Sequence, residues 1–299
     1  MLPPRAVEAW HPRRGYNGRM SRFNLPVLGA GAKPATSEQL VARSLHAEAI
    51  YDGALGETVH LDLGTAIISP DLAEVDMGNE MRDVQAPADG ASVDEAIAGV
   101  ERTFSERKAR CLAWSFAGGV LDEAVAVALE KRGYHRHLTE VWSLKAPRTE
   151  RARRDLTIIP GRASYGKIQE LFRATGAAQH ESAARAAQYT QAAVRCLDDS
   201  RVDAILALDG QSPVGVAYLV TAGEAGFIAD LYVHPARQRE KIGTTLVERV
   251  VELATRSRHR SLTLFCRPGN VAARGLYVAT GWEIVGQTQT LRWPQDSPA

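Results

Sequence analysis

The sequence predicts an α/β fold in which helices flank a mixed, mainly antiparallel sheet, with two such units in tandem. The chain has 299 residues, about twice the usual domain length of roughly 100 to 150 residues. In its second half, three apolar segments follow one another across short turns at Asp209-Gly210 and Gly223, as in antiparallel hairpins. Apolar segments then alternate with helical patterns, which is typical of β-α-β units.

The first segment, residues 1–36, is rich in Arg, Pro and Gly. It contains five arginines, and Glu8 is its only acid. This composition indicates a disordered leader, although an organelle transit peptide shares the arginine bias and stays open as an alternative.

Residues 37–147 are predicted to form the first lobe. From Ser37 to Tyr51, apolar side chains recur at helical spacing. Ser92-Val-Asp-Glu95 has the form of a capping box, which would open a helix ending near Lys108. Further segments complete the lobe: a stretch around 74–84, strands at 66–69, 110–116 and 138–144, and a helix at 121–132.

The lobe boundary is predicted in a charged linker from Lys145 to Asp155, where Pro147 precedes five charged residues. The second lobe is expected over residues 154–294. Its predicted strands are 156–159, 202–208, 214–221, 226–233, 262–266 and 282–293. Its predicted helices are 165–175, 181–197, 243–256 and 271–280.

The charge balance argues against several kinds of partner. Lys plus Arg number 36 and Asp plus Glu number 35, so a net charge of +1 favours neither nucleic acid nor an anionic membrane. No apolar run approaches the ~18 residues that a membrane span requires, and the chain start lacks the apolar region of a secretory signal. We therefore expect a cytoplasmic protein.

Cysteine and histidine usage predicts no metal site. Cys111, Cys196 and Cys266 lie far apart, without metal spacing or a disulfide framework, as in a reducing cytoplasm. His135 and His137 share one strand face but lack further ligands at zinc spacing. Cys266, at a strand end, could carry an acyl group, but a small buried residue is the favoured interpretation.

A candidate anion site lies where the strand containing Asp230 leads through a short loop into the helix that begins near Gly243. Free N–H groups in the first turn of a helix, together with the helix dipole, can hold a pyrophosphate. Glycine would let the backbone approach the anion closely. Positive charge would come from Arg237, Arg239 and Lys241. On spacing alone, a β-α turn with a solvated basic loop is an equal alternative.

Two linked motifs resemble the GNAT family of acyl-CoA N-acyltransferases. Gln238-Arg-Glu-Lys241-Ile-Gly243 is similar to the family's acetyl-CoA motif, Gln/Arg-x-x-Gly-x-Gly/Ala, and Val233-His-Pro235 matches its usual strand end. Lys241 stands at the first Gly, where a Lys side chain can contact phosphate. Downstream, Asn270-Val-Ala-Ala-Arg-Gly-Leu-Tyr277-Val-Ala-Thr-Gly-Trp282 resembles Asn-x-x-Ala-x-x-Leu-Tyr-x-x-x-Gly-Phe.

The resemblance implies a GNAT fold in which acetyl-CoA lies between two diverging strands, with no metal. It implies Tyr277 as the acid for the leaving thiolate, with a core tyrosine as the alternative. Asp230 is the candidate base, followed by Glu224, although a structural role is the favoured interpretation of each carboxylate. Asn270 can equally be only a helix cap. The implied coenzyme-binding residues are Leu231, Tyr232, Val233, Gln238, Arg239, Glu240, Lys241, Ile242, Gly243, Thr244, Asn270 and Ala273.

The first lobe resembles a degenerate GNAT-like repeat. Leu129 to Tyr134 occupies the same helix-end position as Tyr277 to Trp282, which places Leu129 opposite Tyr277 and Asp122 opposite Asn270. No basic loop precedes the helix near Ser92, so we expect no coenzyme there. A coincidental β-α-β order is the alternative.

The predicted function is an acetyl-CoA-dependent N-acetyltransferase. It would move an acetyl or another short acyl group to a primary amine by direct attack in a ternary complex. The acceptor would be a small-molecule amine or a peptide N-terminus, and the protein a monomer or homodimer. A non-catalytic acyl-CoA-binding sensor or interaction module is the alternative. The acceptor is not specified, because Ala163 to Asp199 is polar and alanine-rich without a signature.

Overall fold

The structure is a computed structural model that describes residues 34–87, 92–148, 152–179 and 182–294. Most of the predicted leader lies outside the described residues. Thr36, its last residue, caps the first helix: its side chain accepts from the Gln39 N–H (3.2 Å), and the Gln39 side chain accepts from the Thr36 N–H (3.0 Å).

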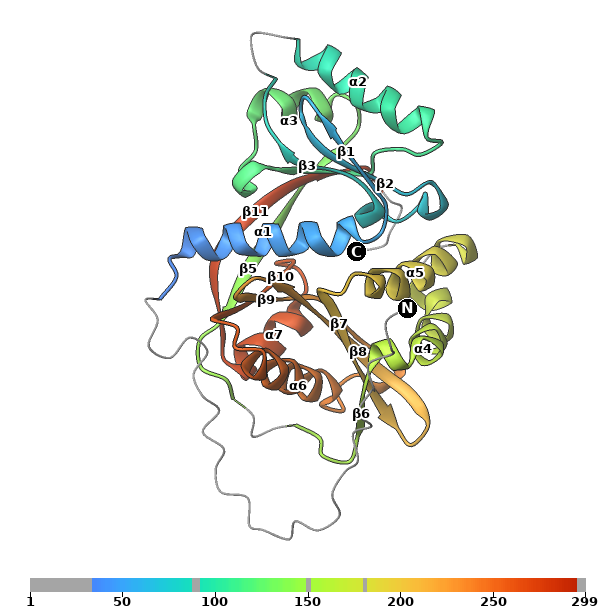
Figure 1. The fold of residues 1–299 in the computed structure, drawn as a ribbon, viewed down its shortest axis with the longest axis vertical. Helices are drawn as coiled ribbons and strands as arrows, with labels where there is room; N and C mark the ends of the chain where they lie inside the picture. Colours follow the sequence, from blue (N-terminus) through green and yellow to red (C-terminus); the bar gives the residue numbers. More distant parts are fainter. Residues whose placement is uncertain (1–33, 88–91, 149–151, 180–181, 295–299) are drawn as a thin grey trace, which may run out of the picture.

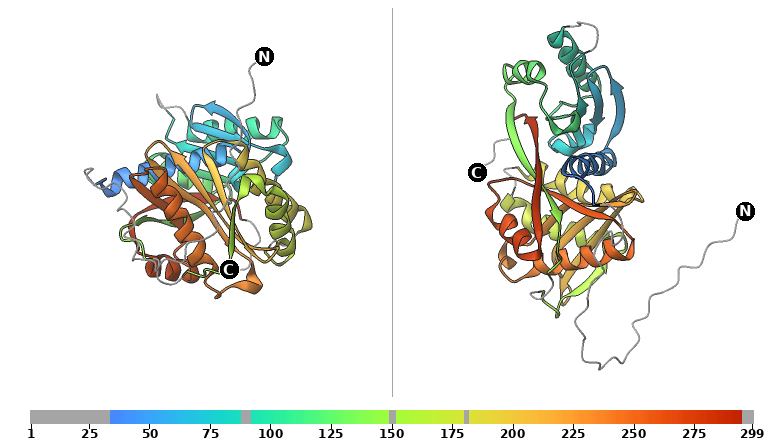
Figure 2. Two further views of the ribbon diagram at one scale, coloured as in Figure 1. Left: turned by 60° about the horizontal axis from the view of Figure 1, so that its bottom comes forward. Right: turned by 90° about the vertical axis from the view of Figure 1, so that its left-hand side faces the viewer.

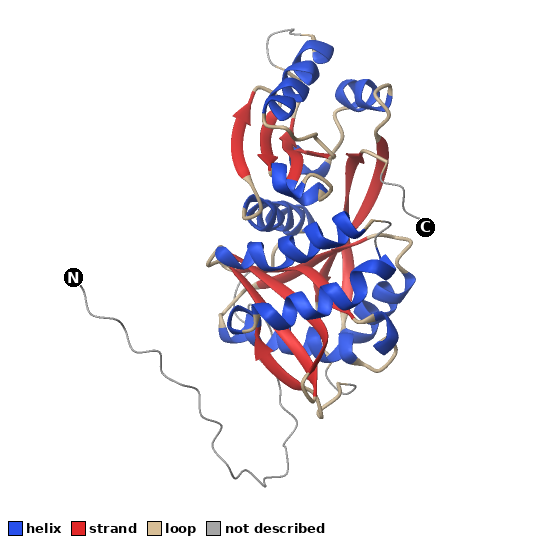
Figure 3. Ribbon diagram, turned by 90° about the vertical axis from the view of Figure 1, so that its right-hand side faces the viewer, coloured by secondary structure: helices blue, strands red, loops and turns tan. Residues whose placement is uncertain are grey.

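In the described residues, eleven strands form one mixed sheet with helices on both faces (Figure 3). The strands are β1 Glu57–Leu61, β2 Gly64–Ile68, β3 Asn79–Val84, β4 Ala113–Phe116, β5 His135–Leu144, β6 Thr157–Pro160, β7 Val202–Asp209, β8 Ser212–Ala222, β9 Ala225–Val233, β10 Ser261–Cys266 and β11 Trp282–Arg292. The α-helices are α1 Ser37–Gly53, α2 Val93–Glu106, α3 Glu123–Glu130, α4 Tyr165–Gln179, α5 Ala183–Arg195, α6 Ile242–Arg256 and α7 Val271–Thr280. The fold class predicted from the sequence is confirmed.

The strand order shows two related halves. It runs β1-β2-β3-β4-β11-β5-β10-β9-β8-β7-β6, so β3 and β4 of the first lobe correspond to β9 and β10 of the second. Both of these pairs are parallel, whereas their outer neighbours pair in antiparallel fashion. The two lobes therefore repeat one topology, in agreement with the predicted tandem arrangement.

The last strands of the two lobes are exchanged. β5 lies between β11 and β10, and β11 lies between β4 and β5, so each strand pairs with elements of the other lobe. Figure 2 shows both strands running the length of the interlobe region. The boundary predicted within 145–155 falls in the segment that joins β5 to β6. It stays a prediction, because the sheet continues from one lobe into the other.

Helix α1 lies between the lobes (Figure 1), although its residues belong to the part of the chain predicted to form the first lobe. It buries Leu40, Ala47, Ile50 and Tyr51, of which the last three belong to the core that also contains α4, α5 and β8. The Tyr51 and Tyr218 rings meet edge to face, with centroids 5.9 Å apart. Helix α1 thus packs against the second lobe.

Two apolar cores cover the two faces of the second lobe's sheet. One lies under α1, α4 and α5, and the other lies under α6 and α7. A third core, around Trp114 and Phe116, lies between helices α2 and α3 and the strands of the first lobe. The three cysteines are buried and free. Among the described helices, none has both the length and the apolar character needed to cross a membrane.

Candidate active site

The candidate site lies where β9 and β10 diverge. Their parallel register runs from Ala225 opposite Ser261 to Ile228 opposite Leu264, and both strands continue beyond the last pair. A pocket of about 980 Å³ occupies the space that follows, between the ends of these strands and helices α6 and α7. This is the place where the family resemblance implied that acetyl-CoA would lie.

The N-terminus of α6 faces this pocket with free backbone donors. Lys241 is the N-cap and makes no side-chain cap, and the first hydrogen bond of the helix is from the Thr245 N–H to the Lys241 carbonyl (3.0 Å). The preceding residues Ile242, Gly243 and Thr244 line the pocket. Since N–H groups of a first helical turn have no partner within the helix, this end is suited to an anion.

Lys241 and Arg239 both have left-handed backbone conformations, with φ of 63° and 67°. Lys241 occupies the place of the first Gly in the motif that the sequence resembles, and it takes a conformation that glycine adopts without strain. The loop therefore keeps the path of a glycine-containing loop, at the cost of a strained non-glycine residue.

Gly243 also has a packing role. A Cβ atom built there would lie 3.1 Å from Leu276 Cδ2 on α7 and 3.8 Å from Leu231 Cδ2 on β9. The missing side chain therefore allows α6 and α7 to approach each other beside the pocket.

Asp230 points into the pocket from β9. Its partner across the antiparallel pair is Tyr218, and the register shifts immediately after this pair. The side chain is accessible from the pocket, yet the protein surrounds it closely enough that desolvation raises the pKa of its carboxyl to about 6. Glu224, the second candidate base, instead pairs with Arg260 at 2.8 Å and does not line the pocket.

Tyr277 enters the same pocket from α7. It is 6% exposed and lies between Trp142 and Trp282, with ring centroids 6.0 Å from each. Burial raises the pKa of its phenol, and the charges of Cys266 and Asp230 add to the shift. The phenol is therefore protonated near neutral pH and is suited to donate a proton.

Strand β5 of the first lobe supports α7 beside Tyr277. Glu140 is 5% exposed and accepts a hydrogen bond from Trp142 Nε1 at 3.1 Å. Its carboxylate also lies 3.1 Å from Nε of Arg274, one turn before Tyr277. The exchanged strand thus fixes the surroundings of the tyrosine.

All but one of the fourteen site residues predicted from the sequence line the pocket. They are Asp230, Leu231, Tyr232, Val233, Gln238, Arg239, Lys241, Ile242, Gly243, Thr244, Asn270, Ala273 and Tyr277. Asn270 both lines the pocket and caps α7, since its Oδ1 accepts from the Ala273 N–H at 3.1 Å.

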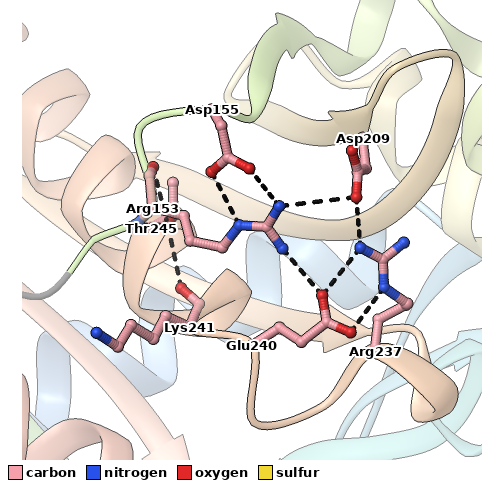
Figure 4. A network of polar contacts seen from close by, with 7 residues as sticks. All are labelled: Arg153, Asp155, Asp209, Arg237, Glu240, Lys241 and Thr245. Carbon is pink, nitrogen blue, oxygen red and sulfur yellow. Dashed lines mark hydrogen bonds and ion pairs between the residues drawn. The ribbon is translucent and has the colours of Figure 1, made fainter.

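Glu240 is the exception, because its side chain belongs to a polar network beside the loop (Figure 4). It accepts from Arg237 Nε at 2.8 Å and from Arg153 Nη1 at 2.9 Å, and Arg237 also pairs with Asp209. The Arg153 N–H donates to Thr245 Oγ1 at 2.9 Å. This network ties the loop and α6 to the linker, so Arg237 is not free to face a pyrophosphate as its position in the sequence suggested.

Several pocket residues carried no motif in the sequence. Phe265, Cys266 and Arg267 line the pocket at the end of β10. Cys266 is 6% exposed, and burial raises the pKa of its thiol to about 11, which keeps the thiol protonated. The only sequence signal for these residues was their position at the end of a predicted strand.

Comparisons with known proteins agree with this geometry. The model of the acetyltransferase (GNAT) family matches residues 167–282. A functionally unknown conserved protein from Staphylococcus epidermidis has a similar structure, with 14% identity and a TM-score of 0.58 over 80% of this chain and 95% of that one. A GCN5-related N-acetyltransferase from Kribbella flavida has 16% identity and a TM-score of 0.57 over 85% and 96%. A search of curated proteins found no match.

Each comparison covers a different part of the chain. The two structural matches have low sequence identity and show the fold, which extends across both lobes. The family match covers the second lobe from α4 to the start of β11, and this range includes the whole pocket wall.

Proposed function

We propose that this chain, whose residues 167–282 form a domain of the GNAT acetyltransferase family, transfers an acetyl group from acetyl-CoA to a primary amine. One observation carries the proposal. An accessible carboxylate with a raised pKa, a buried phenol and the uncapped N-terminus of a helix all line a single pocket between two diverging strands.

The pocket can hold the donor in a defined orientation. The first turn of α6 would bind the pyrophosphate through backbone N–H groups, with Lys241 nearby as a cation. The backbone of β9 from Leu231 to Val233 would run beside the pantetheine arm, where N–H groups can stabilise negative charge on the thioester oxygen.

The side chains then supply both proton transfers. The amine nitrogen forms a bond to the acyl carbon, and Asp230 accepts the proton that this nitrogen loses. The carbon–sulfur bond breaks, and Tyr277 donates its phenol proton to the departing thiolate. Direct attack leaves no acyl group on the protein, in keeping with the protonated state of Cys266.

Two observations favour catalysis over a binding-only sensor. The sensor hypothesis depended on Lys241 replacing a glycine and on the structural role that each candidate base could have. Lys241 adopts the left-handed conformation suited to the glycine, and Asp230 is a carboxylate in the pocket. A cytoplasmic location and a monomeric or dimeric state stay predictions.

The direct test measures release of the coenzyme thiol with a panel of primary amines, for the wild type and for Asp230→Asn. We expect turnover by the wild type and a rate about 10²-fold lower in the variant, the scale of general base catalysis. Calorimetry should show equal acetyl-CoA binding by both proteins. Binding without turnover across the whole panel would instead support the sensor.

A further inference from the structure

The pocket reaches both faces of the second lobe's sheet. Leu231 and Val233 belong to the wall beside α6 and α7, whereas Tyr232 and Phe265 pack with the core under α1, α4 and α5. Tyr232 stacks on Phe172 of α4, with ring centroids 5.1 Å apart. The end of the pocket away from α6 therefore has aromatic walls, and it is the end left for the acceptor.

Arg267 lines this pocket at the end of β10 and is exposed. Across residues 34–87, 92–148, 152–179 and 182–294, its guanidinium has neither a hydrogen bond nor an ion pair. By contrast, Arg237 pairs with Glu240, Arg274 with Glu140, and Arg292 with Asp76. The guanidinium N–H groups of Arg267 are therefore available to donate hydrogen bonds to a ligand.

The charge of Arg267 acts on groups at the interlobe side of the pocket. Burial lowers the pKa of His137 on β5, and Arg292 and Arg267 lower it further. Desolvation raises the pKa of Asp76, but the charges of Arg292 and Arg267, together with hydrogen bonds from the Met77 N–H and Tyr189, lower it by more. Arg267 therefore lies toward the first lobe, away from the phosphate loop.

Arg267, Arg292 and Arg185 lie at this side of the pocket. Asp76 is the one carboxylate that Arg292 pairs with there, and it also accepts a hydrogen bond from Tyr189 at 3.3 Å. The Arg185 guanidinium lies 5.7 Å from the Tyr189 ring, and its buried Nε has no partner in the described part of the chain. Because Arg292 already pairs with Asp76, the charge of Arg267 is left available to an anionic ligand.

We propose that the acceptor is a primary amine that also carries a carboxylate, with its amine at Asp230 and its carboxylate on Arg267. This rests on the proposed acetyl transfer. A single guanidinium binds one carboxylate through two parallel hydrogen bonds. The carbon skeleton between the two ends would lie against Tyr232 and Phe265. Arg267 is then a specificity-determining residue of the acceptor site.

The test uses α- and ω-amino acids, each paired with the corresponding carboxamide, which keeps the amine and removes the charge. Coenzyme-thiol release gives kcat/KM for each compound with the wild type, Arg267→Met and Arg267→Lys. We expect the wild type to prefer the acid about tenfold to hundredfold, as for a hydrogen bond to a charged group. Arg267→Met should bring the ratio near one, and Arg267→Lys should retain part of it. The KM for acetyl-CoA should not change.

Calorimetry of the coenzyme-saturated wild type and Arg267→Met with the same amino acids gives a readout that does not need turnover. Amino-acid binding that Arg267→Met weakens would support the inference. Equal use of acids and carboxamides, or an unchanged ratio in Arg267→Met, would overturn it and leave acetyl transfer standing. If no amine in either series is acetylated, the proposed function fails. Calorimetry then still shows whether Arg267 binds a ligand that carries a carboxylate. Absence of such binding overturns the inference as well.

Discussion

The two lobes share one topology but differ at the point where their parallel strands end. In the first lobe, the pairing of β3 with β4 extends to Val84 opposite Phe116, and Trp114 and Phe116 fill the space beneath. In the second lobe, the pairing of β9 with β10 stops at Ile228 opposite Leu264, and a pocket follows. The same topology thus carries a buried core at the strand ends of the first lobe and a pocket at those of the second.

The helices that follow β3 and β9, which are α2 and α6, also differ between the lobes. The N-terminus of α2 is capped by Ser92, whose side chain accepts from the Glu95 N–H at 3.4 Å, and Asp94 and Glu95 lie in its first turn. The first turn of α6 has neither a side-chain cap nor an acid. The segment before α2, with Asp89 and Gly90, lies outside the described residues. A helix end binds an anion only when its own side chains leave the donors free.

Helices α3 and α7, which occupy corresponding places in the two lobes, differ in the same sense. Leu129 on α3 corresponds to Tyr277 on α7 and is fully buried in the first lobe's core. The nearby Tyr134 donates its hydroxyl to the Cys111 carbonyl at 2.7 Å, so its polar end is satisfied within the protein. We infer that the first lobe supports the second through β5 and α1, without a coenzyme site of its own.

The strongest test converts the N-terminus of α6 in the second lobe into that of α2 in the first. Gly243 is the second residue of α6, and Asp94 is the second residue of α2. Gly243→Asp should abolish acetyl-CoA binding, which we expect to be about micromolar in the wild type, because a carboxylate would meet the pyrophosphate. Calorimetry measures the effect.

Two controls accompany this change. Gly243→Ala adds a methyl group near Leu276 without a charge and should retain most of the affinity. The wild type should bind one acetyl-CoA per chain. Unchanged binding by Gly243→Asp would mean that the pyrophosphate site is elsewhere, and two equivalents per chain would show that the first lobe also binds coenzyme.

Replacing one tyrosine in each lobe should affect kcat in the second lobe and the free energy of unfolding in the first. Tyr277→Phe should lower kcat about 10²-fold with coenzyme affinity nearly intact, because it removes the proton donor. Tyr134→Phe is the matched control: it should lower the free energy of unfolding by about 1 kcal/mol, from the lost hydrogen bond, with kcat unchanged. Parallel loss of coenzyme binding in Tyr277→Phe would assign Tyr277 to packing.

The pH dependence of the rate should report Asp230. The base must be ionised, and burial raises its pKa to about 6, so kcat/KM should rise with pH through that value. At pH 5, about a tenth of the molecules would carry the carboxylate, which predicts a rate roughly tenfold below the plateau. Asp230→Asn should lose this acidic limb. A limb that persists in the variant would assign it to another group.

The local parts of the site could be predicted from the sequence, and the distant contacts could not. Gln238 to Gly243 is one strand-loop-helix junction, so its motif determines its shape. The pairing of Arg237 with Asp209 joins residues far apart in the chain, and no local pattern encodes it. The direction of Asp230 depends on a register shift that simple alternation does not reveal.

The same limit applies to the sheet. All the predicted strands and helices are present, because each has an apolar face or a cap that can be read locally. β1 was not predicted, since it is an edge strand with largely exposed side chains. The exchange of β5 and β11 depends on which partner each strand finds in space, and both have ordinary strand patterns in the sequence.

The smallest effect concerns Lys241, where the loop departs from the glycine of the motif. Lys241→Gly should remove left-handed strain of about 1 kcal/mol, but the greater freedom of glycine in the unfolded chain offsets much of that gain. The free energy of unfolding in denaturant should therefore stay equal or rise slightly. Acetyl-CoA affinity should fall about threefold if the ammonium contacts phosphate, as expected for one exposed ion pair. Affinity equal to the wild type would show that the loop backbone alone holds the phosphate, and a large loss of stability would contradict the strain assigned to Lys241.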